Sequence, residues 1–204
     1  YIEWYRPRHE KWVGIIASRP MWMMDGCSIE KEFLRHLEET GINVILIFTT
    51  FSKNTELGAL SVSENISEFF FMNGNPIVDA MVKFTTAFIG GKSYGNDADS
   101  KVDAEELLES MNIPVYQPIV LGRMSVREWE YSIGLTSDLT WQVAFPEFEG
   151  VIEPFVIGSD AGMDNDDGNR RVLIEERSRS FAKRIFNTIL LKKIPNNMKK
   201  VVIF

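Results

Sequence analysis

Three consecutive segments near the start of the chain predict an α/β fold: Val13-Gly14-Ile15-Ile16-Ala17, then residues 28–40, then Asn43-Val44-Ile45-Leu46-Ile47-Phe48. The first and last segments are short apolar runs, typical of strands that are buried on both faces. The middle segment places Ile29, Phe33 and Leu37 on one face of a helix. Gly41 follows where a C-terminal cap belongs. A strand, a helix and a strand in that order predict a parallel βαβ unit.

The alternation of strands and helices continues along the rest of the chain. Further strands are predicted at residues 80–84, 115–117, 140–145, 152–157 and 199–204. The helices between them are one capped by Ser63, one at residues 103–111, one capped by Ser125, and a long one at residues 171–192. Asp103 and Ser125 each precede a glutamate by three residues, which is the pattern of a capping box. We therefore expect a single α/β unit, a mostly parallel sheet with helices on both faces, with a candidate boundary between two lobes near residues 73–76.

Composition and charge exclude several classes of protein. The chain has 204 residues, of which 45% are hydrophobic and 25% charged, as in an ordinary globular domain. Its net charge of −7 gives no general attraction to nucleic acid or to anionic lipid. No apolar run is long enough to span a membrane, and no signal-peptide pattern opens the sequence. With Cys27 as the single cysteine, an intrachain disulfide is impossible, so we expect a cytoplasmic protein. The apolar run at the end predicts a segment from inside a longer chain.

A glycine-rich stretch after the third predicted strand is similar to part of a P-loop. It reads Gly90-Gly91-Lys92-Ser93, but Thr86 stands where a P-loop has its first glycine. Residues 94–97 also do not open a helix directly. We interpret the stretch as a loop at the carboxyl end of a strand, and a P-loop-like nucleotide hydrolase is the weaker alternative.

The acidic loop at residues 159–169, which we expect to be flexible, has the residue types of a calcium-binding loop but not the spacing of one. An EF-hand loop would need acidic side chains at Met163 and Ile174. His9 and His36 are the two histidines, and His36 is expected at the surface or half-buried beside the apolar stripe of its helix. No cluster of His, Cys and carboxylate residues has the spacing of a metal site, so none is predicted.

A series of short motifs occurs in the order and at the spacing of a known family. They include Pro76-Ile77-Val78-Asp79-Ala80, Phe84-Thr85-Thr86-Ala87-Phe88, Asn96-Asp97-Ala98-Asp99, Asn112-Ile113-Pro114-Val115, Glu128-Trp129 and Pro146-Glu147-Phe148-Glu149-Gly150. Together they resemble the large subunit of the cobalt and magnesium chelatases of tetrapyrrole synthesis, the CobN and BchH/ChlH group. The likeness covers nearly the whole chain and is firmer from Pro76 onward. General likeness favours CobN over its magnesium counterpart.

This resemblance implies an ATP-dependent insertion of Co²⁺ or Mg²⁺ into a tetrapyrrole, of the cobalamin type by preference. In the family the large subunit binds the macrocycle, while separate AAA+ subunits carry ATP and its Mg²⁺. The expected partners are the rest of the large subunit, the AAA+ subunits and the tetrapyrrole. The segment is expected to hold no cofactor and to be inactive alone, and the resemblance identifies no catalytic residue in it. A free-standing ligand-binding module of periplasmic-binding-like shape is the alternative.

The predicted contact surface for a tetrapyrrole lies in two loops. In open parallel sheets, ligands bind beyond the carboxyl ends of the strands. Thr85, Ser93 and Asn96 offer neutral hydrogen bonds in the loop after the third predicted strand. Trp22 and the methionines beside it offer a flat apolar wall in the loop after the first.

Overall fold

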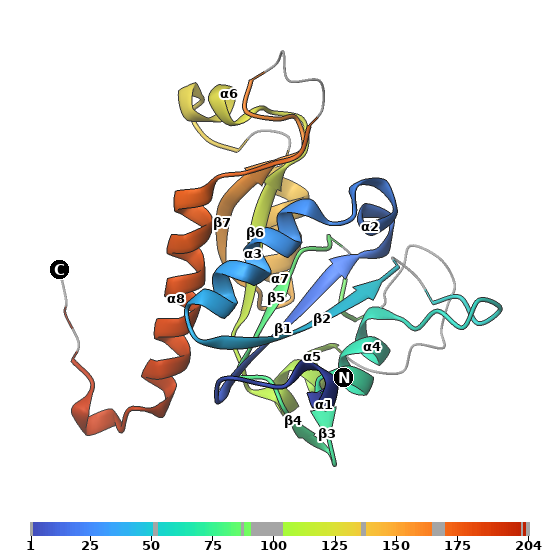
Figure 1. Ribbon diagram of the computed structural model, residues 1–204, viewed down its shortest axis with the longest axis vertical. Helices are drawn as coiled ribbons and strands as arrows, with labels where there is room; N and C mark the ends of the chain where they lie inside the picture. Colours follow the sequence, from blue (N-terminus) through green and yellow to red (C-terminus); the bar gives the residue numbers. More distant parts are fainter. Residues whose placement is uncertain are drawn as a thin grey trace.

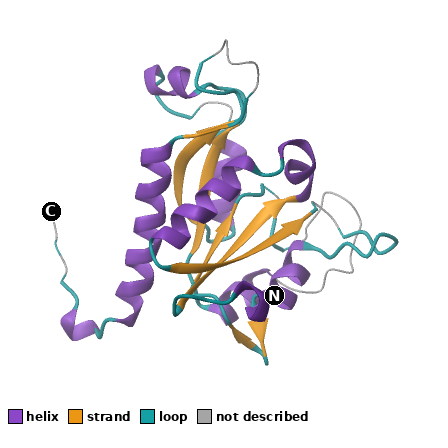
Figure 2. Ribbon diagram, viewed as in Figure 1, coloured by secondary structure: helices purple, strands orange, loops and turns teal. Residues whose placement is uncertain are grey.

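A six-stranded, mostly parallel sheet forms the centre of the protein (Figures 1 and 2). A computed structural model describes residues 2–50, 53–86, 88–90, 104–135, 138–164, 170–200 and 202. The strand order is β2-β1-β5-β6-β7-β8, and β3 pairs with β4 in a separate small sheet. The strands are β1 (Lys11–Ser18), β2 (Ile42–Thr49), β3 (Phe71–Met72), β4 (Asn75–Pro76), β5 (Ala80–Lys83), β6 (Val115–Leu121), β7 (Ile152–Ser159) and β8 (Val172–Leu173). Neighbours in the large sheet are parallel except β7 and β8, which confirms the predicted α/β class.

Helices cover both faces of this sheet. They are α1 (Ile2–Tyr5), α2 (Arg19–Asp25), α3 (Ser28–Glu39), α4 (Val62–Phe69), α5 (Ala104–Met111), α6 (Val126–Tyr131), η1 (Thr140–Ala144), α7 (Phe145–Phe148), α8 (Glu175–Lys193) and η2 (Asn196–Met198). One core cluster joins α3 and α8 to the sheet, and a second joins α4 and α5 to the opposite face. Among the described residues, no helix is both long enough and apolar enough to cross a membrane.

The period of a strand explains how β1 serves both cores. Ile15 belongs to the cluster under α3 and α8, whereas its neighbour Ile16 belongs to the cluster on the other face. Two residues before Ile16, and therefore on the same face of the strand, Gly14 gives space to an aromatic ring. A Cβ at Gly14 would lie 2.5 Å from Cζ of Phe70, which is fully buried. The glycine is therefore required by the close packing of Phe70, the C-cap residue of α4, against the sheet.

Two capping boxes differ in how well the sequence predicts them. At Ser125 the structure confirms the prediction, because Ser125 and Glu128 satisfy each other's backbone N–H groups. At α4 the predicted cap was wrong: Ser61 is the N-cap and Ser63 lies inside the helix. The reason is that Glu64 stands three residues after Ser61, where its carboxylate can accept the N–H of Ser61 at 2.8 Å. The predicted cap at Asp103 lies outside the described residues.

The strand predicted at residues 140–145 was wrong, because this segment forms the π-helical turn η1 followed by α7. A short apolar run fits a helix as well as a strand, and tertiary contacts decide here. The side-chain amide of Gln142 donates to the carbonyl of Val120 at 2.7 Å and accepts its N–H at 3.1 Å. This pairing occurs on β6 where the register with β7 shifts, between Ile119 and Val120.

Other predicted element boundaries also differ from the observed ones because of tertiary contacts. The long helix begins at Glu175 and not at residue 171, because residues 172–173 pair with β7 as β8. Residues 199, 200 and 202 lie in no strand, and the rest of the predicted last strand is outside the described residues.

His36 is 1% exposed and therefore fully buried, contrary to expectation, because α8 packs against α3. Residues 73–76 form the turn and second strand of the β3–β4 hairpin, and the lobe boundary stays a prediction.

Candidate functional site

The order of the parallel strands creates a switch point between β1 and β5. The chain passes from β1 to β2 on one side, and from β5 to β6 and β7 on the other. Ligands in open α/β sheets bind at the carboxyl ends of the two strands where the order reverses. β5 also ends early, because its last residue, Lys83, is level with Ile16. The neighbouring strands run further, β1 to Ser18 and β6 to Leu121, so the candidate site is this carboxyl edge around the end of β5.

A buried ion pair lies at this edge. Lys83 is 1% exposed, and its Nζ is 3.0 Å from Oε2 of Glu149, whose side chain is 9% exposed. Burial lowers the pKa of Lys83, and the charge and hydrogen bond of Glu149 act in the opposite direction. Oε1 of Glu149 accepts the N–H of Ile89 at 2.6 Å and that of Gly90 at 3.4 Å. One carboxylate thus connects the end of β5 to the beginning of the glycine-rich loop.

The turn after α7 positions Glu149. Pro146 occupies the first turn of α7 and is buried, and its carbonyl accepts the N–H of Glu149 at 3.0 Å and that of Val151 at 3.1 Å. Gly150 has a φ of 76°, a left-handed conformation that glycine adopts without strain. From the sequence, this turn contributed only to the family resemblance, and no role was predicted for Lys83. A lysine at the end of an apolar strand was the available signal, because fully buried lysines need a partner.

The predicted substrate-binding residues are only partly described. Trp22 lies on α2, directly after β1, and is 52% exposed. Thr85 lies just after β5 and is buried. Both belong to the carboxyl edge, as the sequence predicted from the direction of the strands. Ser93 and Asn96 lie outside the described residues.

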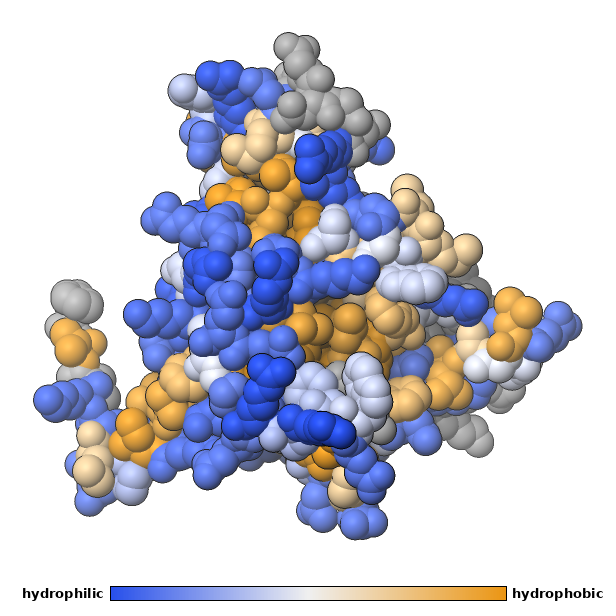
Figure 3. Space-filling view, viewed as in Figure 1, coloured by the Kyte–Doolittle hydropathy of each residue, from blue (hydrophilic) through white to orange (hydrophobic). Residues whose placement is uncertain are grey.

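An apolar surface, here called the carboxyl-edge patch, consists of Trp22, Met23, Met24 and Phe48. Met23 and Met24 are 72% and 79% exposed, and the rings of Trp22 and Phe48 are 6.0 Å apart. Figure 3 shows hydrophobic surface over α2, near the carboxyl ends of β1 and β2. Grouped apolar side chains that remain exposed mark binding surfaces, and methionines adapt to the shape of what they contact.

A network around Arg171 ties the neighbouring loops to the same edge. Its guanidinium donates to Glu30 on α3 at 3.1 Å, to Asp25 at the end of α2 at 3.0 Å, and to Asp160 after β7 at 2.7 Å. Burial alone would lower the pKa of Arg171. The hydrogen bonds and charges of Glu30 and Asp160 have the larger combined effect, so its pKa is raised. Burial raises the pKa of Asp160. We interpret this network as structural, because each of its hydrogen bonds connects two elements of the fold.

The single cysteine does not contribute chemistry to the edge. Cys27 is fully buried between α2 and α3, and its N–H donates to Oδ1 of Asp25 at 2.9 Å. Burial raises the pKa of Cys27 to about 12. Burial therefore disfavours the thiolate form that a cysteine nucleophile needs.

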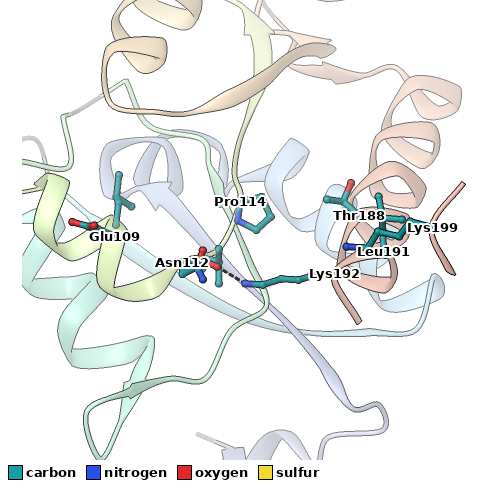
Figure 4. Close-up of a pocket in the computed structure, with 9 residues that line it drawn as sticks. Glu109, Asn112, Pro114, Thr188, Leu191, Lys192 and Lys199 are labelled. Carbon is teal, nitrogen blue, oxygen red and sulfur yellow. Dashed lines mark hydrogen bonds between the residues drawn. The ribbon is translucent and has the colours of Figure 1, made fainter. Parts of the chain in front are cut away.

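A groove of about 770 Å³ lies at the opposite, amino edge of the sheet. It is bounded by α5, by the turn before β6 that contains Asn112 and Pro114, and by the last turns of α8 (Figure 4). Nζ of Lys192 donates to the carbonyl of Asn112 across it. The groove includes none of the described residues that the sequence predicted for substrate binding.

A known protein family matches the chain from end to end. Residues 1–204 match the family described as CobN/Magnesium Chelatase. The chain belongs to the CobN/magnesium chelatase family. This confirms the resemblance inferred from the sequence motifs.

Relatives of this chelatase-family chain are much longer than the chain itself. Two uncharacterized proteins of Methanocaldococcus jannaschii are 33% identical over 193 residues and 29% identical over 197 residues. These matches cover 93% and 94% of the chain but only 15% and 16% of the relatives. The structure titled catalytic subunit of cobaltochelatase from Mycobacterium tuberculosis matches with a TM-score of 0.64 and 23% identity, over 90% of this chain and 15% of that one. At that identity the likeness shows a shared fold.

Proposed function

We propose that this chain is a segment of the tetrapyrrole-binding large subunit of an ATP-dependent chelatase that inserts Co²⁺ or Mg²⁺ into a tetrapyrrole. The family match over all 204 residues is the observation that carries the proposal. The similar solved structure is named as a cobaltochelatase subunit, which favours Co²⁺. A cobalamin-type product is what the resemblance of the sequence implies. In this proposal, ATP and its Mg²⁺ belong to separate AAA+ subunits of a cytoplasmic complex.

Part of the tetrapyrrole contact is assigned to the carboxyl edge. A tetrapyrrole is a wide, flat ring, and the carboxyl-edge patch offers Trp22 for stacking beside adaptable methionines. Thr85, Ser93 and Asn96 would supply neutral hydrogen bonds to the polar substituents at the rim of the ring. The strand order supports this assignment, because the patch and Thr85 flank the switch point between β1 and β5.

Lys83 and Glu149 act as positioning residues in this proposal. Glu149 accepts the N–H groups of Ile89 and Gly90, which precede Ser93 and Asn96 in the sequence. Lys83 in turn holds the carboxylate of Glu149. The pair would therefore fix where the loop leaves the sheet. No catalytic residue is assigned to this segment.

The test is titration of the full-length subunit with its tetrapyrrole, followed by absorbance and tryptophan quenching. Trp22→Ala is expected to raise Kd about three- to tenfold, the contribution of one aromatic stacking contact. Trp4→Ala is the matched control, because Trp4 is also exposed, at 78%, but lies on α1 before the first strand. The double variant Thr85→Ala/Asn96→Ala should also weaken binding. Equal affinity in Trp22→Ala, the double variant and the parent would place the tetrapyrrole elsewhere.

A further inference from the structure

Three side chains that the proposed function does not use converge between α3 and α8. Glu32 and His36 lie about one helical turn apart on α3, and Glu175 is the first residue of α8. One ligand atom from each residue lies within 4.8 Å of the other two. An imidazole nitrogen and two carboxylate oxygens form a donor set for a divalent transition-metal ion.

The orientation of His36 is that of a metal ligand. The side chain is 1% exposed, and Nε2 faces the carboxylate of Glu175. Nδ1 lies 2.7 Å from Oγ of Ser178, which is fully buried. Ligand histidines are commonly held this way, with one ring nitrogen hydrogen-bonded to a neighbouring group while the other faces the metal.

The spacing also fits a bound cation. Nε2 of His36 is 3.2 Å from Oε1 of Glu175. In the tautomer whose Nδ1–H donates to Ser178, Nε2 presents a lone pair toward the carboxylate, and a cation bound between them would relieve the repulsion; in the other tautomer, Nε2–H donates to Glu175. Bonds of about 2.0–2.2 Å in tetrahedral geometry would separate two ligand atoms by roughly 3.4 Å. The observed distance is close to that value.

The site is open to solvent on one side, and the two arginines that compete for its carboxylates are exposed. The side chains of Glu32 and Glu175 are 32% and 57% exposed, so water can complete the coordination of a metal. Arg35 donates to Glu32, and Arg179 donates to Glu175. Both arginines are more than half exposed, at 60% and 51%. Such surface ion pairs contribute little to stability, so the arginines can turn away when a metal binds.

We propose that Glu32, His36 and Glu175 bind a divalent transition-metal ion of the Zn²⁺ or Co²⁺ type, which fastens the start of α8 to α3. The imidazole favours such an ion over Mg²⁺, which prefers oxygen ligands throughout. The site is separate from the carboxyl-edge patch, and its occupancy is independent of tetrapyrrole binding.

Anomalous diffraction from crystals of the full-length subunit soaked in CoCl₂ locates the ion directly. A peak is expected within bonding distance of Glu32, His36 and Glu175. A map with no peak at these side chains overturns the proposal. Soaking with MgCl₂ in place of CoCl₂ should leave the positions of these side chains unchanged.

Titration of the metal-stripped subunit with CoCl₂, followed by calorimetry, tests the ligands one at a time. Glu175→Gln is expected to weaken binding at one site by at least tenfold, and Ser178→Ala by about tenfold through loss of the hydrogen bond to His36. Glu176→Gln is the matched control, because this exposed neighbour of Glu175 is outside the cluster. Equal affinities in Glu175→Gln and the parent would overturn the proposal, and so would an equal loss in Glu176→Gln.

Discussion

Removal of the negative charge from Glu149 is expected to destabilise the fold by about 3 kcal/mol, the lower end of the cost of breaking a buried ion pair. Glu149→Gln keeps the size of the side chain and an oxygen that can accept the N–H of Ile89. It leaves the ammonium group of Lys83 unpaired at a position that is 1% exposed. The lower end of this cost applies because burial already lowers the pKa of Lys83, so its ammonium group can release a proton.

Lys83→Met leaves the carboxylate of Glu149 without its cation, but it should cost less, about 1–2 kcal/mol, because that carboxylate is the less deeply buried charge and retains other hydrogen-bond donors. The carboxylate of Glu149 then keeps its hydrogen bonds from Ile89 and Gly90. Arg127→Met is the matched control for an exposed pair, since the side chains of Arg127 and Asp164 are 64% and 46% exposed. Its expected cost is below about 1 kcal/mol.

Urea denaturation followed by circular dichroism measures all three variants, first at neutral pH and then over an alkaline series. The folded pKa of Lys83 lies below its ordinary value of 10.5, so the unfolded chain binds more protons between those two values. The free energy of unfolding of the parent should therefore rise with pH in that window relative to Lys83→Met. A Glu149→Gln variant as stable as the parent would refute the reasoning. So would a Glu149→Gln variant whose free energy of unfolding falls by less than that of Lys83→Met.

The remaining predictions concern the core and the nucleotide hypothesis. Gly14→Ala should lower the free energy of unfolding by at least about 1–3 kcal/mol, because the new Cβ would collide with the buried ring of Phe70; an unchanged urea midpoint would contradict this. The 204-residue chain alone should hydrolyse no ATP, because Thr86 replaces the glycine that a P-loop requires. A phosphate-release assay checks this, and turnover that disappears in Lys92→Ala would show the prediction to be wrong.

The sequence predicted the central βαβ unit well because its signals are local. Residues 13–17 and 43–48 are apolar runs of strand length, and the helix between them has a clear apolar face. The structure places β1, α3 and β2 there. The segment at residues 140–145 gave no such signal, because a short apolar run fits a strand or a helix. Its conformation depends on Gln142 pairing with Val120, a contact that no local pattern encodes.

The same limit applies to the candidate site. Parallel strands deliver their loops to one edge, so the sequence could place Trp22 and Thr85 there. It could not show that Lys83 and Glu149 form a pair, because their contact joins segments far apart in the chain. His36 was expected at the surface because the pattern of its own helix does not reveal that α8 covers it.

The burial of Cys27 makes the chain suitable for site-specific labelling. Maleimide reagents react with thiolates. Cys27 is fully buried, and burial raises its pKa to about 12, so almost no thiolate is present at neutral pH. A Met24→Cys variant would then carry the one accessible thiol of this 204-residue chain, at a position that is 79% exposed. A fluorophore attached there would report on the carboxyl-edge patch in an otherwise unaltered background, without first replacing the native cysteine.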